Sequence, residues 1–217
     1  DSIKSLLETC SVLITCLPSP DAIRKVIESK LGVLEFITKN HIWIETSTTD
    51  SKEMNRLAKI VQTKGPDVCE ATFTGGVHRA VSGNISILAG GNRKSFNRAL
   101  PLLKEMGSQI LFVSENYGDA NLLKVVTNYL ASANLVSLGE ALMVCAKSGL
   151  DLKICYEGIK ISSGNSFVHE TESQLILSRS FNVNFNMDLA CKDVCFFEDL
   201  SKKLNIPNQI SPLLVKI

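Results

Sequence analysis

Short apolar runs alternate with longer stretches of helical periodicity along the first half of the chain. The runs occupy residues 11–17, 42–44, 68–73, 85–89 and 110–113. Each is only a few residues long and rich in Val, Ile and Leu, which favours buried strands of a parallel sheet. Helices are predicted between them from the spacing of Ile23, Val26 and Ile27, from Met54 to Val61, and over 94–106. Strands alternating with helices predict an α/β fold with a mainly parallel sheet.

The second half of the chain has helical periodicity throughout. A long helix is predicted from residue 120 to about Ser148, with Gly149 at its end, where a left-handed residue commonly stops a helix. Further helices are predicted over 152–161 and 187–204, separated by the polar segment 162–167. We therefore divide the chain into an α/β domain over 1–116 and an all-helical domain over 117–217.

Polar and glycine residues follow three of the predicted strands. The segments are Leu17-Pro18, Ser47-Thr48 and Thr74-Gly75-Gly76. Ligands of parallel α/β sheets bind beyond the carboxyl ends of the strands, where hydroxyl groups and bare amides suit a small oxygenated ligand. Any one of these segments alone is also an ordinary turn or helix cap. Three of them together favour a binding site.

A polar stripe lies on the long predicted helix. Asn121, Lys124 and Asn128 recur at helical spacing, and Lys124 is the only charged residue between positions 120 and 139. Burial lowers the pKa of a lysine because desolvation disfavours the ammonium, so such a lysine can exchange a proton near neutral pH. The alternative is a lysine that extends along an apolar helix to reach water.

Composition narrows the class of partner. The chain has 217 residues, 45% of them hydrophobic and 21% charged, with a net charge of +1. Near neutrality argues against a nucleic-acid partner, and we find no apolar run long enough to span a bilayer, so no membrane partner is expected.

Seven cysteines are present, without a Cys-x-x-Cys pair. Cys191 and Cys195 stand one helical turn apart, but zinc would need further ligands and His169 is the only histidine at all close, so no metal site is expected. We interpret the cysteines as buried reduced thiols, which predict an intracellular, cytoplasmic location, with a mitochondrial one left open.

Five segments in the same order resemble the β-hydroxyacid dehydrogenase family, which includes 3-hydroxyisobutyrate dehydrogenases and tartronate semialdehyde reductases. The resemblance covers essentially the whole chain. Its segments are Leu17-Pro18, Glu45-Thr46-Ser47-Thr48, residues 70–76 with Ala80, Gly83 and Gly90-Gly91 downstream, residues 118–128, and Lys192-Asp193. The resemblance implies part of a Rossmann-type sheet followed by a helical domain like that of 6-phosphogluconate dehydrogenase.

The resemblance also implies roles. Lys124 would be the general acid in carbonyl reduction and the base in alcohol oxidation. The substrate, a small carboxylate, would be held by Thr74, Gly75, Gly76 and Asn128. The cofactor, NAD or NADP, would be lined by Leu17, Pro18 and Thr48, with Lys192 near its nicotinamide end; without the resemblance, Lys192 is equally well a surface lysine.

Several residues depart from the family pattern. Thr74 replaces the usual Ser, Ala120 the second Gly of the lysine segment, and Glu45 and Glu70 the usual Asp. His78-Arg79 stand where small residues are usual, with Arg79 either facing an anion or lying on an exposed loop. These changes put the substrate in question more than the chemistry.

One family signature is absent from the sequence. No Gly-x-Gly-x-x-Gly turn followed by an acidic residue occurs. In the family that turn binds the pyrophosphate of the dinucleotide. We therefore expect an incomplete family member that, as written, binds NAD(P) very weakly and is inactive. A version extended upstream through such a turn is expected to bind NAD(P) and to be active.

Two hypotheses of different class follow. The first is an NAD(P)-dependent oxidoreductase that acts on a short β-hydroxyacid or the matching semialdehyde. The second is a non-catalytic binding or interaction protein on a truncated dehydrogenase fold. The long apolar helix exceeds what one small helical domain can cover, so a homodimer or homotetramer is expected.

Overall fold

The computed structural model describes residues 2–180 and 185–217. Its backbone contacts group the chain into two compact units, Asp1–Val125 and Val126–Ile217. The division falls inside one helix, α7 (Asp119–Lys147), which contributes its first residues to unit 1 and the rest to unit 2. The domain boundary that the sequence analysis places between residues 116 and 117 stays a prediction.

Unit 1 is built on a five-stranded sheet in the order β1-β2-β3-β4-β5. The strands are β1 (Val12–Thr15), β2 (Ile42–Glu45), β3 (Asp67–Thr74), β4 (Ile85–Gly90) and β5 (Gly107–Ser114). All pairings are parallel except that of β3 with β4. The five predicted strands and the mainly parallel sheet are therefore confirmed.

The antiparallel pairing of β3 and β4 has a local cause. Only residues 75–84 connect the two strands, and they hold just the short helix α5 (Val77–Val81). A parallel crossover needs a dozen residues or more, so this connection turns the chain back instead. His78 and Arg79 lie on α5, which corrects the alternative that placed Arg79 on an exposed loop.

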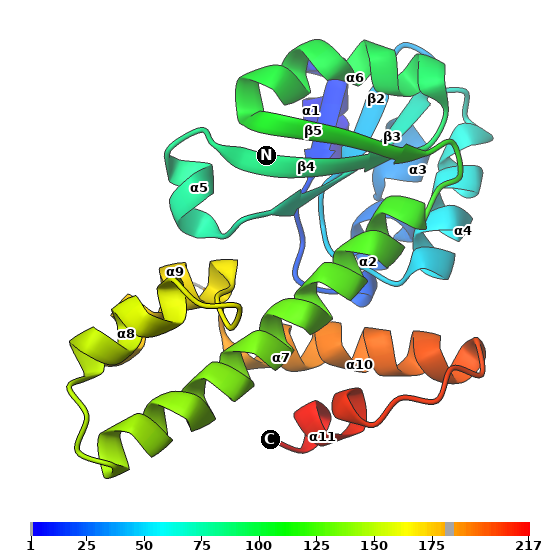
Figure 1. Cartoon of the computed structure of the whole chain (residues 1–217). Helices are drawn as coiled ribbons and strands as arrows, with labels where there is room; N and C mark the ends of the chain where they lie inside the picture. The colour runs from blue at the N-terminus through cyan, green and yellow to red at the C-terminus, as the bar shows by residue number, and fades with distance from the viewer. Residues whose placement is uncertain (1, 181–184) are drawn as a thin grey trace. The chain divides into compact units, whose positions relative to one another are not determined.

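Helices cover both faces of the sheet (Figure 1). They are α1 (Ile3–Thr9), α2 (Pro20–Glu28), α3 (Val33–Phe36) and α4 (Ser51–Gln62) on one face and α6 (Arg93–Met106) on the other. Side-chain alternation along β2 explains the two cores, because Trp43 faces the first group while Ile42 and Ile44 face α6. All three side chains are buried.

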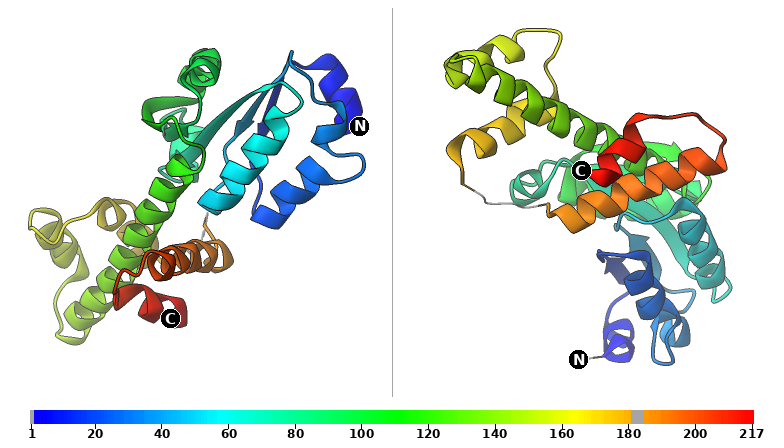
Figure 2. Two further views of the ribbon diagram at one scale, coloured as in Figure 1. Left: turned by 90° about the vertical axis from the view of Figure 1, so that its right-hand side faces the viewer. Right: turned by 90° about the horizontal axis from the view of Figure 1, so that it is seen from below.

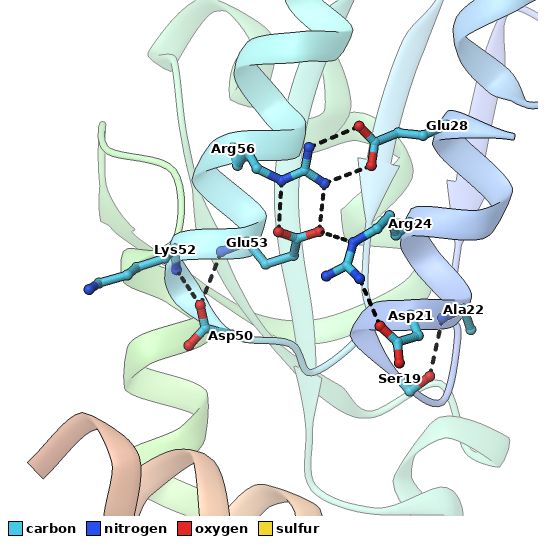
Figure 3. Close-up of polar contacts among 9 residues, drawn as sticks. All are labelled: Ser19, Asp21, Ala22, Arg24, Glu28, Asp50, Lys52, Glu53 and Arg56. Atoms are coloured by element: carbon cyan, nitrogen blue, oxygen red, sulfur yellow. Dashed lines mark hydrogen bonds and ion pairs between the residues drawn. The ribbon is translucent and has the colours of Figure 1, made fainter. Parts of the chain in front are cut away.

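Side-chain oxygens cap the helices that follow the strands. Ser19 accepts from the Ala22 amide at the start of α2, and Asp50 accepts from the amides of Lys52 and Glu53 at the start of α4 (Figure 3). Each cap satisfies amides that have no partner within the helix. The caps fix where α2 and α4 begin, directly after the segments that carry Leu17-Pro18 and Ser47-Thr48.

Unit 2 is helical, as predicted. In addition to the later part of α7, unit 2 contains α8 (Leu152–Lys160), α9 (Phe167–Ser178), α10 (Met187–Lys203) and α11 (Ile210–Lys216). Helices α8 and α9 pack on each other, as do α10 and α11 (Figure 2). The rings of Tyr129 on α7 and Phe197 on α10 stack with their centroids 3.8 Å apart.

Helix α7 has little charge along its length. Its 29 residues include an 18-residue window with a mean hydropathy of 1.4, which is high enough for a membrane-spanning helix. Of that window, 11% is buried. By length and hydropathy alone, it is the one helix within residues 2–180 and 185–217 that could cross a bilayer. The expectation of no apolar stretch long enough to do so is wrong on this criterion, although core helices of water-soluble proteins also meet it.

All seven cysteines are free thiols. Only Cys69, on β3, is buried, and Cys10, Cys16 and Cys191 are exposed. The interpretation of the cysteines as buried thiols is therefore wrong for all but Cys69. Within the described residues no group of three or more His, Cys, Asp or Glu side chains could hold a metal ion.

Candidate functional site

The ends of β1 and β2 are joined by side-chain hydrogen bonds. The backbone amide of Leu17, just after β1, donates to Ser47 Oγ at 2.7 Å. Parallel neighbours end at the same edge of a sheet, so the segments that carry Leu17-Pro18 and Ser47-Thr48 lie together. Pro18 is exposed, while Leu17 and Thr48 are half-buried.

The buried side chain of Glu45 forms hydrogen bonds with residues at this edge of the sheet. Its side chain is fully buried and accepts from the Ser47 amide at 2.7 Å and from Thr15 Oγ1 at 2.5 Å. Trp43 Nε1 donates to the same Thr15 hydroxyl at 2.8 Å. Burial raises the pKa of Glu45, although these hydrogen bonds oppose the rise. The residue that departs from the family pattern is thus part of the framework that holds the 46–49 segment.

Thr74, Gly75 and Gly76 lie where β3 ends and α5 begins. Gly75 and Gly76 have φ angles of 118° and 82°, in the region that favours glycine. A Cβ atom on Gly75 would come within 2.8 Å of Arg79 Cδ. The predicted double-glycine turn at a strand end is therefore present, and Thr74 is half-buried beside it.

Lys124 lies in the second turn of α7 and is 7% exposed. At this exposure most of the Lys124 side chain is shielded from water, which favours a buried lysine over one that extends along the helix to reach water. Burial of an ionisable side chain on an apolar helix is a feature of functional sites.

Asn121 has a different role from the one its helical spacing indicates. Its side chain is fully buried, with Oδ1 accepting from the Thr49 amide at 2.7 Å and Nδ2 donating to Glu70 Oε1 at 2.8 Å. Asn121 therefore does not belong with Lys124 and Asn128 in the predicted polar stripe, because these bonds direct its side chain into the framework. It connects α7 to the segment that carries Thr48.

Glu70 is the second buried carboxylate that sequence reasoning missed. It lies on β3 beside Glu45 in the register and accepts from the amides of Gly118 and Asn121 at 2.7 and 2.6 Å. Burial, with a smaller effect from nearby Asp119, raises its pKa to about 7, against the lowering effect of those hydrogen bonds. The available signal was an acidic residue inside an otherwise apolar strand.

In unit 2, Asp193 joins two of the predicted site residues. Its side chain is 2% exposed, and Oδ2 accepts from Asn128 Nδ2 at 2.6 Å. Its Oδ1 lies 3.1 Å from Lys192 Nζ, with which it forms an ion pair. The ammonium of Lys192 also lies 5.3 Å from the centroid of the Phe196 ring. The sequence paired Lys192 with Asp193 but gave Asp193 no part in holding Asn128.

Comparison with known families accounts for nearly the whole chain. Residues 1–114 match the model of the NAD binding domain of 6-phosphogluconate dehydrogenase. Residues 118–215 match the NAD-binding domain of NADP-dependent 3-hydroxyisobutyrate dehydrogenase. The chain belongs to the β-hydroxyacid dehydrogenase family. Its cofactor class is accordingly NAD or NADP, and the resemblance seen in the five segments is confirmed.

Individual members of the β-hydroxyacid dehydrogenase family are distant in sequence and close in fold. The chain is 29% identical to 2-(hydroxymethyl)glutarate dehydrogenase of Eubacterium barkeri over 95% of its length and 68% of the relative's. It is 26% identical to 2-hydroxy-3-oxopropionate reductase of Escherichia coli, over 96% of its length and 72% of the relative's. A solved 3-hydroxyisobutyrate dehydrogenase of Salmonella typhimurium matches with TM-score 0.90 at 21% identity, covering 99% of this chain and 75% of that one.

Proposed function

We propose that this protein transfers hydride between NAD(P) and a short β-hydroxyacid or the matching semialdehyde, with Lys124 as the general acid and base. The observation that carries the proposal is the burial of Lys124 on an apolar helix, within the segment that matches the family motif. The nicotinamide supplies the hydride chemistry, and the protein has to supply the proton. The family and its named relatives support an oxidoreductase of this class.

Lys124 suits the proton step because a lysine ammonium can donate to the oxygen of a carbonyl and take the proton back from an alcohol. A desolvated ammonium gives up its proton more readily than one in water. We assign Asn128, one turn later on α7, to the substrate oxygen, and the Asp193 carboxylate orients its amide group.

The substrate carboxylate is assigned to Thr74, Gly75 and Gly76. Glycine amides without a Cβ allow an anion to approach the backbone closely, and the Thr74 hydroxyl adds a neutral donor. Leu17, Pro18 and Thr48 are assigned to the dinucleotide and Lys192 to its nicotinamide end. The Ser47 bond to the Leu17 amide supports this assignment, since it holds the two loops together.

We also propose that the protein works as a homodimer or homotetramer. Large apolar side chains of unit 2 are exposed on α7 and α8, including Met143 at 62%, Val144 at 66% and Ile154 at 70%. Exposed apolar surface of this kind is typical of protein interfaces. A second copy is the simplest partner for it.

The substitution Lys124→Ala tests the proposed function. Removal of a general acid–base group lowers turnover by roughly 10²–10⁴. Because the chain as written is expected to be inactive, turnover is measured on a version that carries a Gly-x-Gly-x-x-Gly turn upstream. The assays use NAD and NADP with a panel of short β-hydroxyacids and their amides, and circular dichroism monitors folding. A carboxylate-binding site predicts that the acids are preferred over the amides.

Lys147→Ala is the matched control, since Lys147 is an exposed lysine at the other end of the same helix. It should leave turnover unchanged. Turnover of Lys124→Ala within threefold of the parent would remove Lys124 from the mechanism.

A further inference from the structure

The first turn of α7 is held by a buried carboxylate from the sheet. Glu70 is fully buried on β3, and its two oxygens accept three hydrogen bonds: from the amide of Gly118 at 2.7 Å, from the amide of Asn121 at 2.6 Å and from Asn121 Nδ2 at 2.8 Å. Leu122 makes the first intrahelical bond, to the Gly118 carbonyl. The amides that Glu70 binds are therefore among those that the helix itself cannot satisfy.

The geometry around Gly118 allows this contact. Gly118 has a φ of 96°, and a Cβ atom on it would lie 2.2 Å from the backbone oxygen of Ser51. Glycine thus lets the chain between β5 and α7 pass close to the start of α4 and direct its amide at Glu70. A carboxylate at a helix N-terminus is also favoured by the helix dipole.

The same contact reaches a second element. Asn121, which donates to Glu70 through its amide and its side chain, accepts from the Thr49 amide at 2.7 Å. Thr49 follows Thr48 in the segment after β2. Glu70 and Asn121 therefore join β3, the start of α7 and the 46–49 segment within unit 1.

We propose that Glu70 is a positioning residue for Lys124, fixing the first turn of α7 so that the lysine one turn later is held in place relative to the strand ends. This inference rests on the proposed function of Lys124. Glu70 itself takes no part in proton transfer to substrate, because it is fully buried and its oxygens are occupied by Gly118 and Asn121. Displacement of a reacting group by about 1 Å can lower a rate roughly 10²-fold.

The charge on Glu70 makes this positioning depend on pH. The titratable groups around it are Glu45 on β2, Cys69 on β3 and Asp119 on α7, while its partner on β4 is Gly90. Burial raises the pKa of Glu70 to about 7, so the carboxylate form that accepts all three bonds is lost as the pH falls through about 7.

The test combines Glu70→Gln with nuclear magnetic resonance of the isotope-labelled chain. In the parent, the amide proton signals of Gly118 and Asn121 should titrate with a midpoint near pH 7, and in Glu70→Gln they should not. In the version that carries the Gly-x-Gly-x-x-Gly turn upstream, the kcat of Glu70→Gln should fall roughly 10- to 100-fold with KM changed less than threefold. The fall in parent kcat below about pH 7 should disappear in the variant. Glu70→Asp keeps the carboxylate and should recover part of kcat.

Asp119→Asn is the matched control for charge in the same turn, and it keeps the proposal testable if Glu70→Gln does not fold. Removal of this neighbouring negative charge should move the amide titration and the acid fall in kcat to lower pH, without loss of the pH 8 rate. Amide signals that do not titrate in the parent, or a Glu70→Gln enzyme with parental kcat and pH profile, would overturn the inference. A parental rate in Lys124→Ala would instead overturn the proposed function and leave the amide titration standing.

Discussion

Buried acidic residues distinguish this chain at the scale of single residues. Glu45, Glu70 and Asp193 are each at most 2% exposed, and each holds a segment that carries predicted site residues. From the sequence, the two glutamates were departures that put the substrate in question. In the structure they are acceptors for backbone amides and side chains, so the departures bear on how the site is held and leave the substrate open.

Substitution of Asp193 tests one of these contacts. Asp193→Ala removes the buried carboxylate that accepts a hydrogen bond from Asn128 and forms an ion pair with Lys192. Hydrogen bonds to charged groups contribute roughly 1.5–3 kcal/mol each, so we expect the free energy of unfolding to fall by about 2–3 kcal/mol. Urea denaturation followed by circular dichroism measures it.

Asp199→Ala on the same helix is the control for Asp193, because Asp199 is exposed. A change of less than about 0.5 kcal/mol is expected there. If the two substitutions lower the free energy of unfolding equally, the contacts of Asp193 with Asn128 and Lys192 do not stabilise the fold.

At the scale of elements, α2 and α4 are joined by a network of charged side chains (Figure 3). Arg56 on α4 donates to both oxygens of Glu28 at 2.8 and 2.7 Å and to both oxygens of Glu53 at 2.8 and 2.7 Å. Arg24 on α2 lies 3.0 Å from Glu53 and 2.9 Å from Asp21. Hydrogen bonds from Arg56 lower the pKa of Glu28 and of Glu53. The network fixes α2 against α4, the two helices that follow the candidate cofactor loops.

Arg56→Met measures the contribution of this network. The guanidinium side chain is 40% exposed and screened by solvent, so we expect a loss of about 1 kcal/mol and a smaller one at high salt. Because folding lowers the pKa of both glutamates, their stabilisation is present above the unfolded value of 4.5 and is lost as the pH falls below it. The difference between parent and variant should therefore shrink in acid.

The control for Arg56 is Lys59→Met, an exposed lysine on the same helix. It should change the free energy of unfolding by less than about 0.5 kcal/mol. A loss for Arg56→Met that is independent of salt and of pH would assign the effect to packing of its aliphatic stem.

At the scale of the whole molecule, exposed apolar surface on unit 2 predicts self-association. Met143→Glu combined with Ile154→Glu places charges at positions 62% and 70% exposed, where a second copy is proposed to bind. Burial of an unpaired charge in an interface is costly, so the molecular mass derived from sedimentation should be lower for the variant than for the parent. Sedimentation velocity provides the measurement.

Leu31→Glu serves as the control, since Leu31 is an apolar residue of unit 1 that is 71% exposed. It should leave the sedimenting mass unchanged. A parent chain that sediments as a 23.7 kDa monomer at micromolar concentration would contradict the proposed oligomer.

The sequence by itself determined the elements and the family. Apolar runs and helical periodicity depend on neighbouring residues, so they located all five strands, α6, α7 and α10. Motif order identified the family. Only the tertiary structure decided the antiparallel pairing of β4 and the roles of Asn121, Glu45, Glu70 and Asp193. Apart from the bond of Glu45 to the nearby Ser47 amide, those roles depend on hydrogen bonds between groups 30 to 72 residues apart in the chain, and no local pattern encodes such a contact. For Lys124 both contributed. Its position on the helix was predicted from the spacing of polar residues, while the extent of its burial was established by the tertiary structure.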